Sequence, residues 1–319
     1  MADRSLRALG LDGAPAELPL TYPGRPVGEP ALLTGGELLP LRPQAGPPGE
    51  WRVVTGMGGA EPVLDVFLDR MSAARVRSRH PVLAVGSNAS PAQLHHKLTR
   101  SGPGATVPMA PVEVHGIGVG CSAHIGRHGY VAAAPYADPA ARRTLVAGWL
   151  DDAQLAVVDE TEFNYRRVWV PGGDFPMTLP SGHRLGGAHL YVSLHGVLAD
   201  PGGAGPRAGG GDQRGLLSAL LAASQALREL LGPGPEDWVT RARADEAVRA
   251  EGRAVFRREG WVLPEGLPPG EGGSGGRTGD RPGDQPGDRT GDRTGDQAGD
   301  QAGDQPGDRP HQALPTPRS

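Results

Sequence analysis

The chain contains almost no cysteine, few aromatic residues and no long apolar run. Its 319 residues include one cysteine, Cys121, so no disulfide can form within the chain. No apolar stretch approaches the roughly 20 residues needed to span a bilayer, and the chain does not open with a basic segment followed by an apolar one. We therefore expect a soluble cytoplasmic protein without a membrane partner.

An excess of one charge is also missing, and lysine is almost absent. The formal net charge of −4 gives no indication of a nucleic-acid or polyanion partner. Of the 32 basic residues, only Lys97 is a lysine. We interpret this bias as the mark of a GC-rich genome rather than of function. The oligomeric state stays open.

Glycine and proline are abundant instead. The 51 glycines and 33 prolines make up more than a quarter of the chain, which indicates substantial disorder. Residues 279–310 are eight tetrapeptides of the form Gly-Asp-x-x, without an apolar residue larger than alanine. Such a repeat cannot build a core, and it lacks the aliphatic positions of a calcium-binding β-roll. We expect a disordered tail over residues 266–319.

Apolar periodicity predicts an α+β domain between an N-terminal arm and two helices. Residues 1–58 read as an irregular Pro/Gly-rich arm, and residues 59–198 as a small mixed β-barrel or highly curved sheet with a leading helix. The predicted helices of this domain cover residues 61–78, 91–98 and 151–160. The predicted strands cover residues 82–85, 111–121, 129–135, 144–150, 165–170 and 187–194.

The C-terminal part of the chain is predicted to be helical before the repeats begin. Residues 199–212, rich in glycine, read as a flexible linker. A leucine stripe predicts one helix over residues 213–231, and residues 236–259 read as a second. We therefore expect a helical pair within residues 213–265.

The apolar strand at residues 82–85 ends abruptly at Gly86-Ser87-Asn88. One explanation is an ordinary turn, since these residue types are common in turns. The other is a loop that binds an anionic group through exposed backbone N–H groups and short polar side chains. Gly86 would then allow close backbone approach. The loop alone does not decide between the two.

Further motifs follow this loop in a fixed order. They are Gly-Tyr-Val-Ala at residues 129–132, Val-Ala-Gly-Trp-Leu at 146–150, Leu-Ala-Val-Val-Asp-Glu-Thr-Glu at 155–162, Tyr-Arg-Arg at 165–167 and Ala-His-Leu-Tyr at 188–191. Over about residues 81–197 this order resembles the γ-glutamylcyclotransferase-like family. That resemblance implies a small mixed β-barrel flanked by helices. It also implies cleavage of a γ-glutamyl amide, in which the substrate's own α-amine attacks the γ-carbonyl to release 5-oxoproline and a free amine.

The resemblance assigns roles to six residues. Glu162 stands where the family has its acid/base glutamate, with Asp159 and Glu160 as neighbouring alternatives. Substrate would be held by Val85, Gly86, Ser87, Asn88 and Tyr191, although Tyr191 also reads as a half-buried strand tyrosine. Neither a cofactor nor a metal is implied, because the substrate supplies the nucleophile.

Three departures from the family pattern keep a non-catalytic binding or interaction module open as an alternative. Val85 replaces a tyrosine, Phe163 replaces a glycine and Val131 replaces a proline. Glu162 pointing into a pocket beside residues 86–88 would favour the enzyme. Phe163 filling that pocket would favour the binding module.

The ten histidines do not indicate a metal site. His95 and His96 are adjacent, so they point apart on a helix. His124 and His128 are four residues apart, but glycines beside them argue against a helix there. No HExxH motif and no Cys/His ligand spacing occurs.

Overall fold

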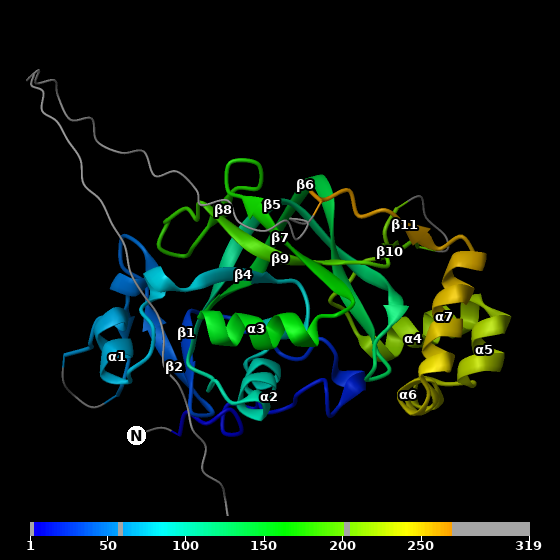
Figure 1. Cartoon of the computed structure of the whole chain (residues 1–319), viewed down its shortest axis with the longest axis horizontal. Coiled ribbons are helices and arrows are strands. Elements are labelled where there is room, and N and C mark those ends of the chain that lie inside the picture. Colours follow the sequence, from blue (N-terminus) through cyan, green and yellow to red (C-terminus); the bar gives the residue numbers. More distant parts are fainter. Residues whose placement is uncertain (1–2, 57–59, 201–204, 270–319) are drawn as a thin grey trace, which may run out of the picture. The chain divides into compact units, whose positions relative to one another are not determined.

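A computed structural model of the chain describes residues 3–56, 60–200 and 205–269, and these residues fall in one compact unit (Figure 1). The fold is mixed α+β. The predicted repeat tail, apart from residues 266–269, lies outside the described residues. Within them, no helix has both the length and the apolar character needed to cross a membrane.

Eleven strands and seven helices make up the described part of the chain. The strands are β1 Ala31–Thr34, β2 Glu37–Arg42, β3 Arg52–Val53, β4 His80–Ala84, β5 Val107–Ile125, β6 Val131–Leu150, β7 Tyr165–Pro171, β8 Met177–Thr178, β9 Gly187–Ser193, β10 Val197–Leu198 and β11 Val262–Leu263. The helices are α1 Leu64–Arg70, α2 Pro91–Ser101, α3 Asp152–Thr161, α4 Gln213–Ala223, α5 Gln225–Leu231, α6 Pro235–Ala244 and α7 Glu246–Arg258.

A long antiparallel hairpin of β5 and β6 is the centre of the sheet. The strand order is β3-β2-β1-β5-β6-β4-β9-β7, and β4 pairs with β9 in parallel while the other pairs are antiparallel. The described residues show no pairing between β3 and β7, the two ends of this path. The predicted barrel is therefore not confirmed, and the sheet is open.

The separate strands predicted at 129–135 and 144–150 are one strand, β6. Asp138-Pro139 between them reads as a turn in the sequence. In the structure this segment lies opposite Gly116, where the register shifts between His115 and Ile117. Gly116 has a φ of +82°, which a glycine adopts without strain. Proline is tolerated at such an irregularity, so the strand continues past it.

The N-terminal segment is not an irregular arm, because it adds three strands to the sheet. β1 pairs with β5 and with β2. Gly35 and Gly36 connect β1 to β2 with φ values of +54° and +79°, the conformation of a two-residue hairpin turn. Leu32 and Leu33 on β1 are fully buried. Short apolar pieces suffice here because neighbouring strands supply the rest of the core.

The structure has four helices, α4 to α7, in place of the predicted C-terminal helical pair. Ser224 interrupts the first predicted helix and caps α5, accepting a hydrogen bond from the Leu227 amide. Asp245 interrupts the second and caps α7 in the same way through Ala247. These capping residues redirect the chain, although the leucine periodicity continues through the first break. The segment 199–212 is also paired in part, since Ala208 bridges to Gly120 on β5.

The four helices pack on the sheet through their own apolar cluster. Leu217, Trp238 and Phe256 are fully buried and share a cluster with Ile125 and Val131 at the end of the β5–β6 hairpin. The helical group therefore closes over one end of the hairpin.

The start of α2 was predicted correctly, whereas the length of α1 was not. α1 is shorter than residues 61–78, because the chain turns after Met71 with Ser72 at a φ of +55°. α2 begins at Pro91 as predicted, with Ser90 at the N-cap, although the Ser90 side chain makes no capping hydrogen bond. α3 begins with a capping box formed by Asp151 and Gln154.

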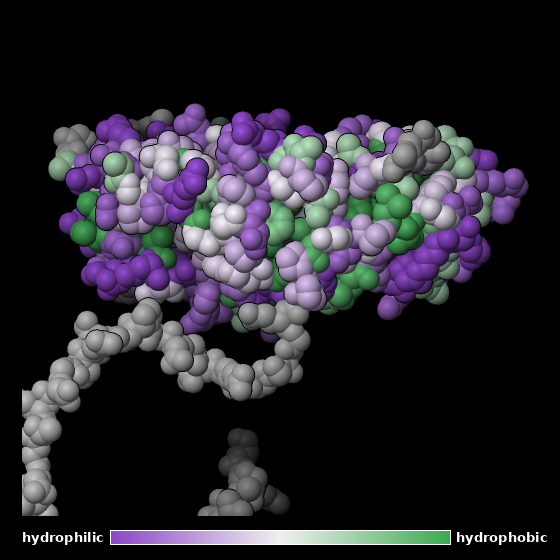
Figure 2. Space-filling view, turned by 90° about the horizontal axis from the view of Figure 1, so that it is seen from above, coloured by the Kyte–Doolittle hydropathy of each residue, from purple (hydrophilic) through white to green (hydrophobic). Residues whose placement is uncertain are grey.

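Large exposed apolar residues are scattered over the fold rather than gathered. On the face shown in Figure 2, apolar residues form separate patches among polar ones. The exposed large apolar side chains come from different elements and loops. They are Leu9, Leu18, Val66, Met71, Phe163, Trp169 and Leu194.

The burial of β1 predicts a contrast between two leucines of the N-terminal segment. Leu33 is fully buried, whereas Leu18 is 53% exposed. Leu33→Ala should lower the free energy of unfolding by about 2–5 kcal/mol, because it leaves a cavity in the core. Leu18→Ala should change it by less than about 0.5 kcal/mol. Urea denaturation of both variants measures the difference, and equal effects would show that the segment is not part of the folded core.

Candidate functional site

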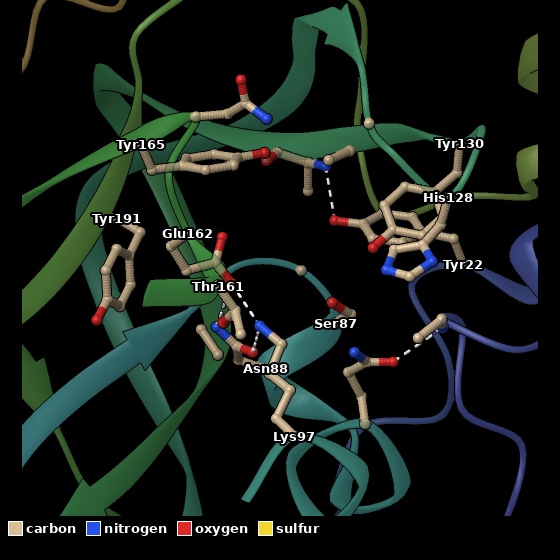
Figure 3. Close-up of a pocket in the computed structure, with 18 of the residues that line it drawn as sticks. Tyr22, Ser87, Asn88, Lys97, His128, Tyr130, Thr161, Glu162, Tyr165 and Tyr191 are labelled. Atoms are coloured by element: carbon tan, nitrogen blue, oxygen red, sulfur yellow. Dashed lines mark hydrogen bonds and ion pairs between the residues drawn. The ribbon is translucent and has the colours of Figure 1, made fainter. Parts of the chain in front are cut away.

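A pocket of about 300 Å³ lies where β4 ends, between α2, the end of α3 and the turn of the β5–β6 hairpin (Figure 3). All six residues assigned by the resemblance line it: Val85, Gly86, Ser87, Asn88, Glu162 and Tyr191. Residues 74 positions apart, such as Asn88 and Glu162, meet there. The pocket is therefore the candidate functional site.

The loop after β4 forms a tight 3-10 turn over Ser87–Ala89. The N–H groups of Gly86, Ser87 and Asn88 donate no hydrogen bond to any residue that the structure describes. A Cβ atom on Gly86 would lie 2.3 Å from the hydroxyl oxygen of Tyr22. Glycine is thus required by the approach of Tyr22, a reason that the sequence did not reveal.

Glu162 lies at the C-cap of α3 and joins a hydrogen-bonded triad with Asn88 and Lys97. The Asn88 amide nitrogen donates to Glu162 Oε1 over 3.0 Å, and the Lys97 ammonium donates to the same oxygen over 2.7 Å. Lys97 also donates to Asn88 Oδ1 over 2.8 Å. The Lys97 and Glu162 side chains are only 10% and 15% exposed. Both donors reach Oε1, and no hydrogen bond from a described residue reaches Oε2.

Lys97 is the member of this triad that the sequence analysis did not predict. It lies on α2 and reaches the pocket beside the loop after β4. The available signal was its uniqueness among 32 basic residues. A lysine ammonium is a compact charge on a flexible stem, whereas arginine presents a planar fork. A site that needs a single small cation can therefore require lysine even in an arginine-rich chain.

The two alternative carboxylates do not take part in the pocket. Asp159 Oδ1 accepts hydrogen bonds from Tyr191 Oη over 2.7 Å and from Arg167 Nε over 2.9 Å. Glu160 is exposed on α3 and does not line the pocket. Tyr191 lines the pocket, but its hydroxyl is committed to Asp159. Glu162 is thus the one carboxylate among the three that faces the cavity.

Tyrosines form much of the pocket wall. Four of the chain's five tyrosines line it: Tyr22, Tyr130, Tyr165 and Tyr191. The rings of Tyr22 and Tyr130 stack with centroids 4.3 Å apart. Burial raises the pKa of all four phenols well above their ordinary value. The wall is therefore poor at stabilising charge.

The tyrosine wall is held together by one backbone position on β6. The Ala133 N–H donates to the Tyr22 hydroxyl over 2.7 Å, and the Tyr165 hydroxyl donates to the Ala133 carbonyl over 3.0 Å. Tyr22 belongs to the N-terminal segment. The pocket is therefore complete only when that segment is folded against the sheet.

The three departures from the family pattern have different structural consequences. Phe163 lies at the pocket rim and is 57% exposed, so it does not fill the cavity. Val85 lines the pocket next to the tyrosines. Val131 is buried in the apolar cluster under the helical group and does not line the pocket.

The charges around the pocket are mostly positive. Lys97, Arg100 and Arg127 line it together with a single carboxylate, Glu162. Arg100 and Arg127 form no ion pair with a carboxylate in the described residues. The mouth therefore favours an anionic group.

His124 sits beside the pocket in a buried chain of hydroxyl groups. Its Nδ1 lies 2.5 Å from Ser122 Oγ, which lies 2.7 Å from Ser193 Oγ. Burial is the main cause that lowers the pKa of His124 to about 3. Within the described ranges no group of three or more His, Cys, Asp or Glu side chains could hold a metal ion.

No protein-family model matches the chain, and a search of curated proteins finds no match.

The lowered pKa of His124 predicts acid sensitivity of the fold. Between its folded pKa of about 3 and the ordinary value of about 6.5, the unfolded chain binds more protons at this residue. The free energy of unfolding should therefore fall as pH drops through that window, by up to about 1.4 kcal/mol per pH unit. In urea denaturation at a series of pH values, the free energy of unfolding should depend less steeply on pH for His124→Gln than for the unaltered protein. Parallel slopes would show that His124 titrates normally.

The triad predicts energetic coupling between Lys97 and Glu162. Removing one partner leaves the other charge poorly solvated. A double-mutant cycle with Lys97→Met and Glu162→Gln should give a coupling of about 1–3 kcal/mol, between the values of exposed and buried pairs. Chemical denaturation of the four proteins measures it. Additive effects of the two substitutions would mean that the interaction between Lys97 and Glu162 does not contribute to the free energy of unfolding.

Proposed function

We propose that the protein is a γ-glutamylcyclotransferase-like enzyme, which cleaves a γ-glutamyl amide by intramolecular amine attack to give 5-oxoproline and a free amine. The observation that carries this proposal is the position of Glu162, which faces a pocket beside residues 86–88. The small barrel of that family is part of the proposal, with the β5–β6 hairpin as its curved centre.

Glu162 has the geometry of a proton carrier. Asn88 and Lys97 hold its Oε1, so the orientation of the carboxylate is set. Oε2 is then available to take a proton from the substrate's α-ammonium and to deliver one to the departing nitrogen. A positioned carboxylate in this role contributes about 10²–10⁴-fold to a rate.

The loop after β4 has the donors for a developing negative charge. The N–H groups of Gly86, Ser87 and Asn88 make no hydrogen bond to the described part of the chain. Preorganised donors of this kind stabilise an oxyanion or a carboxylate. Together with Arg100 and Arg127, which line the pocket, they support an anionic small-molecule substrate. That the enzyme meets this substrate in the cytoplasm and has no nucleic-acid partner is part of the proposal.

A non-catalytic binding module is the second candidate. The Lys97 ammonium neutralises Glu162 over 2.7 Å. A carboxylate and an ammonium side by side also complement a zwitterionic amino acid, which can bind without reacting. The exposed position of Phe163 favours the enzyme, because the pocket stays open.

Glu162→Gln should abolish the release of 5-oxoproline from a panel of γ-glutamyl dipeptides and amines. Glutamine keeps the shape of the side chain but cannot carry the proton, so a loss of about 10²–10⁴-fold is expected. Glu160→Gln, two residues away on the exposed side of α3, should keep full activity.

Two outcomes would contradict the proposal. Release that persists in Glu162→Gln would remove the assigned acid/base. No release by the unaltered protein, combined with binding of panel members by calorimetry, would favour the binding module.

A further inference from the structure

We propose that Lys97 and Asn88 form an isopeptide cross-link within the chain, with Glu162 as the proton carrier for its formation. The inference comes from the mutual geometry of the three side chains. It does not depend on the proposed enzymatic activity, although the same carboxylate serves both.

The three side chains present an amine, an amide and a shared acid/base. Lys97 Nζ lies 2.8 Å from Asn88 Oδ1, which places the amine against the amide group. Glu162 Oε1 lies 2.7 Å from that amine and 3.0 Å from Asn88 Nδ2, the group that would leave. One carboxylate oxygen thus contacts both the nucleophile and the leaving group. Figure 3 shows the triad with its connecting contacts.

The existing hydrogen bond between Lys97 and Glu162 offers a route to the neutral amine that the reaction needs. The Lys97 and Glu162 side chains are largely buried, and Tyr22 and Tyr191, which line the same pocket, are buried as well. Poorly solvated ions are costly, and transfer of one proton along an existing hydrogen bond removes both charges. Transfer from Nζ to Oε1 would give a neutral amine, the nucleophilic form of lysine.

The reaction balances without an external reagent. Neutral Nζ attacks Asn88 Cγ, forming the Nζ–Cγ bond and placing the charge of the tetrahedral intermediate on Oδ1. Glu162 delivers the proton it accepted to Nδ2, and the Cγ–Nδ2 bond breaks. The second proton lost by Nζ follows through Glu162 to the departing ammonia. The lysine ammonium and the asparagine amide thus become a secondary amide and an ammonium ion, with no change of oxidation state.

The fold supplies the proximity that this reaction needs. Asn88 lies in the 3-10 turn after β4, and Lys97 lies on α2, which begins three residues after Asn88. Glu162 is held at the end of α3 against both. Fixing the reacting groups in contact converts a slow bimolecular reaction into an intramolecular one, which accelerates it strongly.

Cross-linking would change the electrostatics of the pocket. The ammonium beside Glu162 would become a neutral amide, and Asn88 Nδ2 would leave as ammonia. Glu162 Oε1 would therefore lose its cationic partner and the Asn88 donor. The chemistry is also that of the proposed reaction, because in both cases an amine attacks an amide beside Glu162. Lys97 and Asn88 would stand in for the substrate's amine and amide.

Mass spectrometry of the full chain tests the cross-link. Cross-linked protein should be lighter by the mass of one ammonia molecule. Lys97 is the chain's only lysine, and its cross-linked side chain resists trypsin. Digestion should therefore give residues 80–100 as one peptide that lacks one ammonia, in place of the separate peptides 80–97 and 98–100.

Lys97→Arg and Glu162→Gln are the matched controls. Arginine keeps a positive charge but should not form the amide, and the glutamine side chain cannot carry the proton. Both variants should keep the full calculated mass. A succinimide at Asn88 would also lose ammonia, but it would persist in Lys97→Arg and would leave Lys97 open to trypsin. That pattern would overturn the proposal.

Full mass and complete cleavage after Lys97, in protein aged in neutral and mildly alkaline buffer, would likewise overturn it. This result is separate from the 5-oxoproline assay, so failure of one proposal does not imply failure of the other. The double-mutant cycle of Lys97 and Glu162 should be measured on protein of full mass, because a cross-linked chain lacks the Lys97 ammonium.

Discussion

The antiparallel pairing of β5 and β6 is the interaction on which the rest of the structure depends. The N-terminal hairpin adds to one side of this pair through β1, and β4 adds to the other. The C-terminal helices cover the end of the hairpin, where Ile125 and Val131 enter their apolar cluster. A Cβ on Gly252 would lie 2.4 Å from Ile125 Cδ1, so α7 needs a glycine to approach the strand.

The same hairpin makes the pocket possible. Its β6 strand holds two tyrosines through the backbone of Ala133, one from the N-terminal segment and one from β7. The remaining wall comes from α2 and the end of α3. Such a wall disfavours isolated charges, and this is why Glu162 is found with an ammonium and an amide beside it. The contacts with Lys97 and Asn88 thus stabilise the Glu162 carboxylate beside an aromatic wall.

Two chemical outcomes share this arrangement. With a γ-glutamyl substrate in the pocket, the proposed enzyme would use Glu162 to move a proton from the substrate's amine to its leaving group. Without one, the nearest amine and amide are Lys97 and Asn88. Both proposals depend on a carboxylate held by one oxygen beside an amine and an amide, and they differ in which molecule supplies those groups.

The sequence by itself determined the local features. Among them are the strand that ends before Gly86, the helix that starts at Pro91 and the short helix before Glu162. These depend on apolar periodicity and caps, which are properties of neighbouring residues. The grouping of Glu162 with residues 86–88 was expected only from the resemblance to a family, because these residues are far apart in the chain. The closed barrel predicted with them is not confirmed.

Only the tertiary structure decided the rest. Leu33 and Tyr22 lie in a segment too poor in apolar residues to be read as folded, and only the strands beside it bury them. Ser224 and Asp245 break helices that periodicity alone would continue. Lys97 acquires its role from Asn88 and from Glu162, which is 65 residues away. Contacts between segments distant in the chain carry no local signature, so their physical reason appears only once the chain is folded.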